Sequence, residues 1–161
     1  MPKLLHRLCL VLLVLLVALP AAASEKLSER DRRIYREAFA AVEKGQWVRA
    51  REVAARAENP LLAKVIQWMD LLQPGPGRSF AEMSEFLATN PDWPLLTTLR
   101  ANAERAMPKN LGASEVIAWF DERPPRTAAG VMRLATAFLE TGRVEEAQAL
   151  VARIAGSAER A

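Results

Sequence analysis

The fold is decided by residues 41–72, AVEKGQWVRAREVAARAENPLLAKVIQWMDLL. Gly45 stands where one helix ends and the chain reverses, because glycine adopts positive φ at little steric cost. Apolar residues then recur at spacings of 3, 4 and 3, which puts one face of a second helix inward: Trp47, Ala50, Ala54 and Ala57. Asn59-Pro60 starts a third helix, since Asn caps a helix and Pro suits its first turn. The stretch predicts a two-helix repeat unit.

The same unit recurs along the chain with a period near 33 residues. Helix starts expected at Pro60, Pro94 and Thr127 lie 34 and 33 residues apart. Gly142 follows Gly45 at an offset of 97, close to three periods. A period of this length is typical of tetratricopeptide-like repeats. The sequence therefore predicts an all-α fold, an α-solenoid or superhelix of about four tetratricopeptide-like helical hairpins. An irregular helical bundle with coincidental spacing is the alternative.

Eight helices are expected, over about residues 29–44, 46–57, 60–72, 79–89, 94–106, 116–120, 127–141 and 144–154. Ser79 and Glu82 form the pattern of a capping box at the fourth helix, and Pro94 is expected in the first turn of the fifth. Ser28 and Asp31 form a similar box at the first helix. The residues expected to face the core are Ile34, Phe39 or Ala38, Ala41, Val42, Met83, Phe86, Leu87, Leu95, Leu96, Leu99, Ala103, Ala106, Val116, Ile117, Trp119 and Phe120.

Residues 1–23 have the pattern of a signal peptide. A basic start precedes an almost unbroken apolar run over residues 8–19, and small residues follow up to Ala23. We expect cleavage near Ala23 and a periplasmic location, with residues 24–161 forming the superhelical repeat domain. A retained membrane anchor is the alternative, but the apolar run is shorter than the roughly 20 residues that a span needs.

Removal of the first 23 residues takes away the only cysteine and the only histidine, Cys9 and His6. The rest of the chain then has no disulfide, thiol nucleophile, histidine-based triad or His/Cys metal site. We expect no catalytic, cofactor-binding or metal-ligating residue. The formal net charge of +3 falls to +1 without Lys3 and Arg7. The basic residues alternate with acidic ones, so we expect no nucleic-acid partner.

Three acidic pairs are the remaining candidates for acid–base chemistry: Glu82/Glu85, Asp121/Glu122 and Glu145/Glu146. Glycoside chemistry needs a carboxyl group whose pKa is raised by an apolar pocket at a cleft. Glu82 already has a capping role, and Glu145 lies in the first turn of a helix, where negative charge suits the dipole. Capping or solvated roles are therefore favoured over an active site.

Four tryptophans suggest a platform for carbohydrate: Trp47, Trp68, Trp93 and Trp119. Trp47 and Trp68 lie on apolar helical stripes, which favours packing in the core. Trp93 lies in a turn between two predicted hairpins, where it can fill the junction. It is nevertheless the one candidate contact for a glycan or a protein partner.

Two segments carry a family likeness, residues 59–64 (NPLLAK) and residues 79–96 (SFAEMSEFLATNPDWPLL). They resemble the N-terminal superhelical region of soluble lytic murein transglycosylases, and the run from Phe86 to Pro94 is the most specific part. The resemblance implies a U- or ring-shaped α-superhelix in the periplasm. It also implies a separate lysozyme-like domain that cleaves peptidoglycan with a catalytic Glu, and no residue of this sequence matches that domain.

Two functions are therefore expected as alternatives. The first is the non-catalytic scaffold of an exported lytic transglycosylase, inactive alone and incomplete at its C-terminal end. The second is a free-standing periplasmic tetratricopeptide-like adaptor that binds a protein or a peptide. Solenoids end in a polar capping helix, whereas the last predicted helix carries Leu150, Val151 and Ile154. We expect these residues to form an exposed apolar end face.

Overall fold

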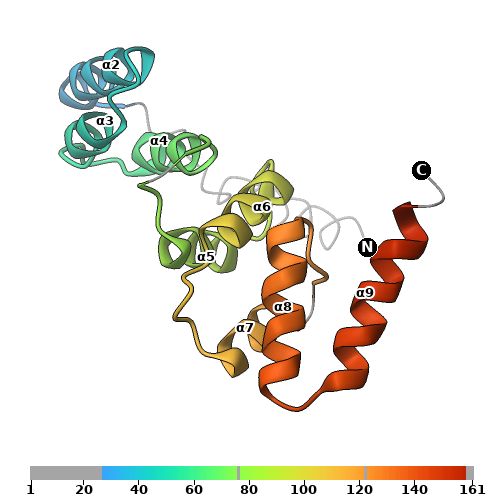
Figure 1. Ribbon diagram of the computed structural model, residues 1–161. Coiled ribbons are helices and arrows are strands. Elements are labelled where there is room, and N and C mark those ends of the chain that lie inside the picture. Colours follow the sequence, from blue (N-terminus) through green and yellow to red (C-terminus); the bar gives the residue numbers. More distant parts are fainter. Residues whose placement is uncertain (1–26, 76, 122, 159–161) are drawn as a thin grey trace, which may run out of the picture. The chain divides into compact units, whose positions relative to one another are not determined.

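The computed structural model describes residues 27–75, 77–121 and 123–158, and every regular element among them is an α-helix (Figure 1). The prediction of an all-α fold built from helical hairpins is confirmed. The helices are α2 (Glu29–Glu43), α3 (Trp47–Ala54), α4 (Leu61–Leu71), α5 (Phe80–Thr89), α6 (Leu96–Ala106), α7 (Ala113–Phe120), α8 (Ala128–Glu140) and α9 (Val144–Ala158). The predicted signal peptide, residues 1–23, lies outside the described residues.

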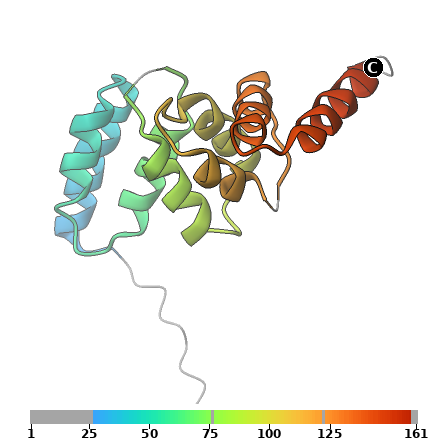
Figure 2. The same cartoon turned by 60° about the horizontal axis from the view of Figure 1, so that its bottom comes forward.

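The chain divides into two compact units, one ending at Pro60 and the other starting at Leu61. The first unit contains the hairpin of α2 and α3, which lie side by side (Figures 1 and 2). Gly45 has a φ of +67° between them, as the reversal predicted for this position requires. Ala38, Ala50 and Ala54 are buried where the helices meet, since small side chains permit close approach. Tyr35, which the sequence analysis did not place inward, is also buried.

The capping box predicted at α2 forms only in part, because the Asp31 side chain binds elsewhere. The Ser28 hydroxyl accepts a hydrogen bond from the Asp31 N–H at 3.0 Å, so Ser28 caps the helix as expected. The Asp31 carboxylate is 2% exposed and accepts from the backbone N–H groups of Glu58 and Asn59, at 3.0 and 3.1 Å. The hydroxyl of Tyr35 donates to the Asn59 carbonyl. The buried carboxylate therefore fixes the turn after α3.

In the second unit, α5 packs on α6, α7 on α8 and α8 on α9, while α6 also contacts α8. One core cluster comprises Leu71, Met83, Phe86, Leu87, Leu99 and Ala103. A second comprises Met107, Val116, Phe120, Leu134, Ala137 and Leu150. The inward positions predicted for α5 are confirmed, because Met83, Phe86 and Leu87 are buried. Of the four predicted for α7, Val116 and Phe120 are buried, whereas Ile117 and Trp119 are only partly buried and pack against the second cluster.

The start of α6 differs from the prediction. The helix begins at Leu96, after Leu95 in the left-handed conformation (φ 57°), and Pro94 lies before it. The Pro94 carbonyl accepts a hydrogen bond from the Trp68 indole at 3.0 Å, which holds this residue in the turn. Leu95 was expected in the core but is 57% exposed. The apolar stripe of the helix is instead carried by residues such as Leu99, which is fully buried.

Glu104 of α6 holds the start of α8. Its side chain is 1% exposed and accepts from the N–H groups of Arg126 and Thr127, and from the Thr127 hydroxyl at 2.7 Å. Thr127 in turn caps α8 by accepting from the Gly130 N–H at 3.0 Å. A Cβ at Gly130 would lie 2.5 Å from a Glu104 carboxylate oxygen, so any larger residue there would displace the Glu104 side chain.

Gly142, with a φ of +75°, turns the chain from α8 into α9, as the repeat predicted. Of the three residues expected in an exposed end face, Val151 and Ile154 are exposed, whereas Leu150 is buried against α7 and α8. Within the described residues, no helix is long and apolar enough to cross a membrane.

Candidate functional site

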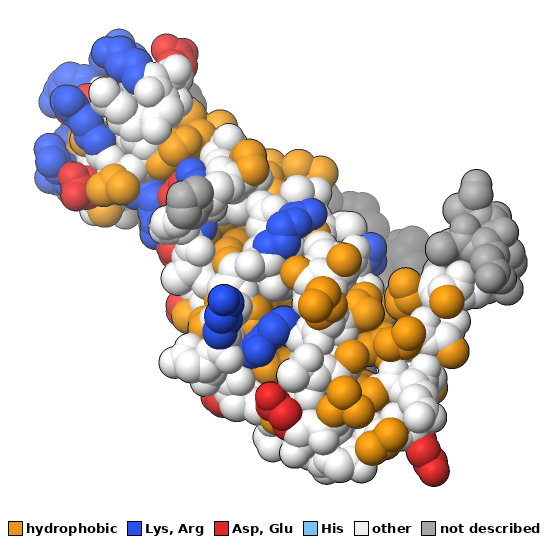
Figure 3. Space-filling model, viewed as in Figure 1, with side chains coloured by type: hydrophobic (Ala, Val, Ile, Leu, Met, Phe, Trp, Pro, Cys, Tyr) orange, Lys and Arg blue, Asp and Glu red, His pale blue; other side chains and the backbone are white. Residues whose placement is uncertain are grey.

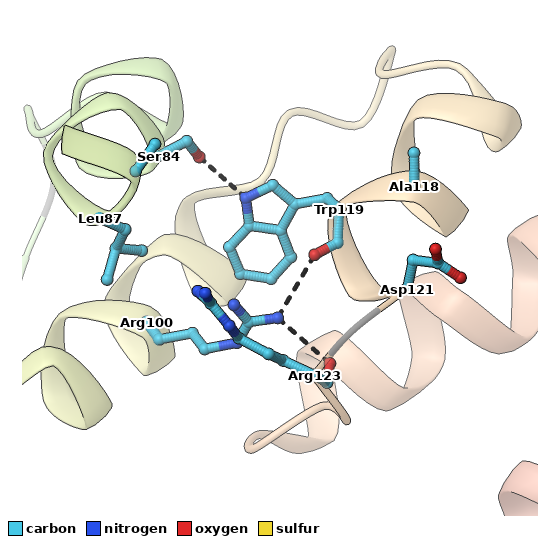
Figure 4. Close-up of a pocket in the computed structure, with 8 residues that line it drawn as sticks. Ser84, Leu87, Arg100, Ala118, Trp119, Asp121 and Arg123 are labelled. Carbon is cyan, nitrogen blue, oxygen red and sulfur yellow. Dashed lines mark hydrogen bonds between the residues drawn. The ribbon is translucent and has the colours of Figure 1, made fainter. Parts of the chain in front are cut away.

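A cavity of about 350 Å³ opens between α5, α6 and α7 (Figure 4). Ser84 and Leu87 reach it from α5, Arg100 from α6 and Trp119 from α7. Asp121 and Arg123 come from the turn that follows α7. Three helices of one compact unit thus place polar, charged and aromatic side chains around a single opening.

The Trp119 ring forms one wall of the cavity and is held from several sides. Its indole N–H donates to the Ser84 hydroxyl at 3.0 Å, which ties α7 to α5. The ring meets Phe120 edge-on with centroids 4.8 Å apart, and Phe80 at 5.5 Å. The guanidinium carbon of Arg100 lies 4.3 Å from its centroid. This aromatic surface is therefore fixed before any ligand arrives.

Arg100 is the unusual group of the site, because it is a cation that is only 6% exposed. Its Nη2 donates to the backbone carbonyls of Trp119 at 3.3 Å and of Arg123 at 3.1 Å, as Figure 4 shows. Its buried Nε has no hydrogen-bond partner among the described residues. Burial lowers the pKa of the Arg100 guanidinium, and the nearby positive charges of Arg123 and Arg126 lower it further.

Among the described residues, no carboxylate forms an ion pair with Arg100. Glu104 is the anionic group that favours the charged form of Arg100, but its oxygens already accept from Arg126 and Thr127. Asp121 lines the cavity, yet Figure 4 shows its carboxylate turned away from the Arg100 guanidinium. Among the described residues that line the cavity, cationic side chains therefore outnumber anionic ones.

A second cavity of about 460 Å³ lies on the other side of the same turn, between α7, α8 and α9. Asp121 and Arg123 line both cavities. The walls of the second cavity are largely apolar, with Phe120, Leu134 and Phe138 among them.

The arrangement suits binding better than catalysis. A catalytic carboxyl would need an apolar pocket aimed at the substrate, whereas Asp121 is exposed. No group of three or more potential metal ligands occurs in the part of the chain that the structure describes. Fixed hydrogen-bond donors beside an aromatic face instead provide a surface that can hold and orient a polar ligand.

Trp93, the candidate contact named from the sequence, lies outside this cavity. Its ring meets Phe86 edge-on with centroids 5.7 Å apart, and the Lys64 ammonium lies 5.7 Å from its centroid. Trp93 is half-buried and packs against the first core cluster of the second unit, as does Trp68. The ring fills the junction between α5 and α6, which was the structural role considered for it.

Two of the acidic pairs have a member that is bound by another residue. The Glu82 carboxylate accepts from the Gln67 amide at 3.0 Å, and the Ser79 hydroxyl caps α5 as predicted. Glu145 and Glu146 lie in the first turn of α9, where Glu146 pairs with Arg143. Glu122 lies outside the described residues.

Arg100 and Ser84 were not predicted as site residues from the sequence, and Trp119 was expected to face the core. A signal for Arg100 existed: it follows Leu96 by four residues and precedes Ala103 by three, which places a charge on the apolar face of α6. The same spacing places Glu104 there. Charged residues on an inward face require a partner or a ligand.

Comparison with known proteins gives no assignment, since no family model, no curated protein and no solved structure matches the chain.

Proposed function

We propose that this chain is the non-catalytic helical scaffold of an exported peptidoglycan lytic transglycosylase. In this role it engages the cell wall while a separate catalytic domain cleaves the glycan strands. The observation that carries the proposal is the cavity at Arg100 and Trp119, where the described residues offer fixed donors and an aromatic face, and where the Asp121 carboxylate is turned away from Arg100. The link to the cell wall comes from the sequence resemblance over the run from Phe86 to Pro94.

The contacts of that run support a structural role within the scaffold. Asn90 caps the end of α5 through its side-chain amide, which donates to the Phe86 carbonyl at 2.9 Å. Trp93 packs against Phe86, and Lys64 donates to the Asn90 side-chain oxygen at 3.2 Å. The run therefore joins α4, α5 and α6 at one junction, as expected of a motif that sets how successive hairpins stack.

A pull-down on purified peptidoglycan tests the proposal, with muropeptide release measured in the same tube. We expect binding without release, and we expect weaker binding to chitin, a glycan that lacks the peptides. Release of anhydro-muropeptides would contradict the non-catalytic role. Absence of binding to peptidoglycan would contradict the cell-wall assignment.

A second candidate function, an adaptor for a protein or peptide, is favoured by the apolar surface of α8 and α9. Exposed apolar side chains gather over these two helices (Figure 3): Met132, Leu139, Val144, Val151 and Ile154. Neighbouring exposed apolar residues are typical of protein contact sites. If this surface binds a partner, Met132→Glu abolishes the complex, whereas Val48→Glu on the equally exposed face of α3 leaves it intact.

A further inference from the structure

We propose that the cavity between α5, α6 and α7 is a carboxylate-binding site, in which Arg100 and Arg123 hold one carboxylate beside the Trp119 ring. The site itself follows from the side chains of this unit. Its assignment to a carboxylate of peptidoglycan peptides rests on the proposed function. The experiments below therefore test the site and the source of the ligand separately.

The first step is the unused donor capacity of Arg100. A guanidinium has five N–H donors in a planar fork. Within the described residues, both hydrogen bonds that it donates come from Nη2, and the buried Nε has no partner. An unpaired buried donor is costly unless a ligand or water satisfies it. The planar fork is complementary to the two oxygens of a carboxylate.

The second step is the placement of a further cation at the same opening. Arg123 lines the cavity, and its charge disfavours the protonated form of Arg100. Two like charges are held close together here, and an anion between them relieves their repulsion. Among the described residues that line the cavity, two arginines and one aspartate are charged, an excess of positive charge that fits a single carboxylate better than a phosphate dianion.

The third step is the size and polarity of the space around the two arginines. The cavity of about 350 Å³ accommodates a small group rather than a folded domain. Beyond Asp121 and Arg123, the apolar walls of the second cavity can receive a side chain such as a methyl or isopropyl group. This combination fits the end of a peptide, a free carboxylate that follows a small apolar residue.

Titration of the purified protein with N-acetylalanine, monitored by calorimetry and by the indole N–H resonance of Trp119, tests the site. N-acetylalanine amide has nearly the same shape without the charge, so it serves as the matched ligand. We expect at least tenfold weaker binding of the amide, since a charge-assisted hydrogen bond is lost. Equal binding of the two ligands, or no shift of the Trp119 resonance, would overturn the proposal. Inorganic phosphate is the third probe, and tighter binding of phosphate than of the carboxylate would also overturn it.

Two variants, each lacking one positive charge, test whether the carboxylate binds at this cavity. Arg123→Gln removes an exposed side chain that donates no hydrogen bond in the described structure, so the fold is expected to survive. It is expected to weaken carboxylate binding roughly tenfold. Arg36→Gln removes the same charge from an exposed position of α2 and is expected to leave binding unchanged. A similar loss in both variants would indicate non-specific attraction and would contradict the assignment.

The source of the carboxylate is decided by repeating the peptidoglycan pull-down with Arg123→Gln. Reduced retention of this variant supports a peptide carboxylate of the cell wall. If N-acetylalanine does not bind while peptidoglycan does, the carboxylate site is wrong and the scaffold proposal stands. If N-acetylalanine binds and peptidoglycan does not, the site stands and the cell-wall assignment is wrong.

Discussion

Arg78 and Arg100 are both largely buried guanidinium groups of the second compact unit, but their surroundings differ. Arg78 follows the end of α4 and pairs with Asp70, with its Nη2 2.8 Å from a carboxylate oxygen and its Nε 2.9 Å from the same oxygen. The Arg78 side chain is 14% exposed and the Asp70 side chain 8%. Within the part of the chain that the structure describes, no carboxylate pairs with Arg100, and its guanidinium donates through Nη2 alone, to two backbone carbonyls.

Because their surroundings differ, we assign Arg78 a role in stability and Arg100 a role in binding a ligand. At Arg78, the buried positive charge is neutralised within the protein, because Nε and Nη2 both reach the Asp70 carboxylate. At Arg100, the charge is buried beside other cations and faces a cavity, so the protein has retained an unsatisfied group. Such a group costs stability, and a site that binds an anion explains why it is present.

The largest loss of stability is expected when the ion pair between Asp70 and Arg78 is broken. Asp70→Asn removes the charge that neutralises Arg78 and leaves a largely buried cation. We expect a loss of about 3 kcal/mol in the free energy of unfolding, because breaking one side of a buried pair strands the other. Urea denaturation followed by circular dichroism measures it. A loss below about 1 kcal/mol would remove the distinction between the two arginines.

Glu104→Gln is expected to cause the next largest loss of stability, because it removes the negative charge that favours the charged form of Arg100. The carboxylate accepts from two backbone N–H groups and a hydroxyl, and an amide oxygen replaces it poorly. We expect destabilisation of about 2 kcal/mol. Denaturation compared with Glu115→Gln, an exposed glutamate that caps α7, gives the matched control.

Arg100→Met tests whether Arg100 serves to bind a ligand and contributes little to stability. Methionine keeps an apolar stem on α6 but removes a charge that no carboxylate contacts. Replacing a buried charge with an apolar side chain is often nearly neutral, so we expect a stability loss of no more than about 1 kcal/mol. Carboxylate binding is expected to disappear in the same variant. A loss as large as that of Asp70→Asn, measured by the same denaturation, would make Arg100 a structural group.

The smallest effect is expected at the surface, where Arg143 pairs with Glu146. A hydrogen bond from Arg143 lowers the pKa of Glu146 in the folded protein. The pair therefore stabilises above the unfolded pKa of Glu, near 4.3, and is lost as pH falls through the lower folded pKa. We expect Arg143→Gln to lower the melting temperature slightly at about pH 7, and not at about pH 2. The variant Arg143→Lys, which keeps the charge, is the control.

Much of the fold could be predicted because it depends on local pattern. Gly45 and Gly142 mark the two hairpin turns, and both have positive φ in the structure. The caps at Ser28 and Ser79 follow from residues three positions apart. Buried residues on α5 and α7 recur at helical spacing, so periodicity alone locates Met83 and Phe120.

The remaining features depend on contacts between distant residues. Pro94 was expected inside α6, but the Trp68 indole, 26 residues earlier, holds its carbonyl outside the helix. Asp31 and Glu104 were not expected to be buried, since their partners lie 27 and 22 residues away. The cavity was missed for the same reason, because Ser84, Arg100 and Trp119 meet only after three helices have packed.

The capture of the loop before α8 by Glu104 has a consequence for the order of folding. A helix normally receives its cap from a residue next to it in the sequence, so that its first turn can form alone. Thr127 supplies such a local cap to α8, but the backbone N–H groups of Arg126 and Thr127 that lead into the helix are bound by a side chain of α6, which must already be docked. Kinetic analysis of variants is therefore expected to find α6 structured in the transition state before the first turn of α8, so that order spreads along this unit from one hairpin to the next.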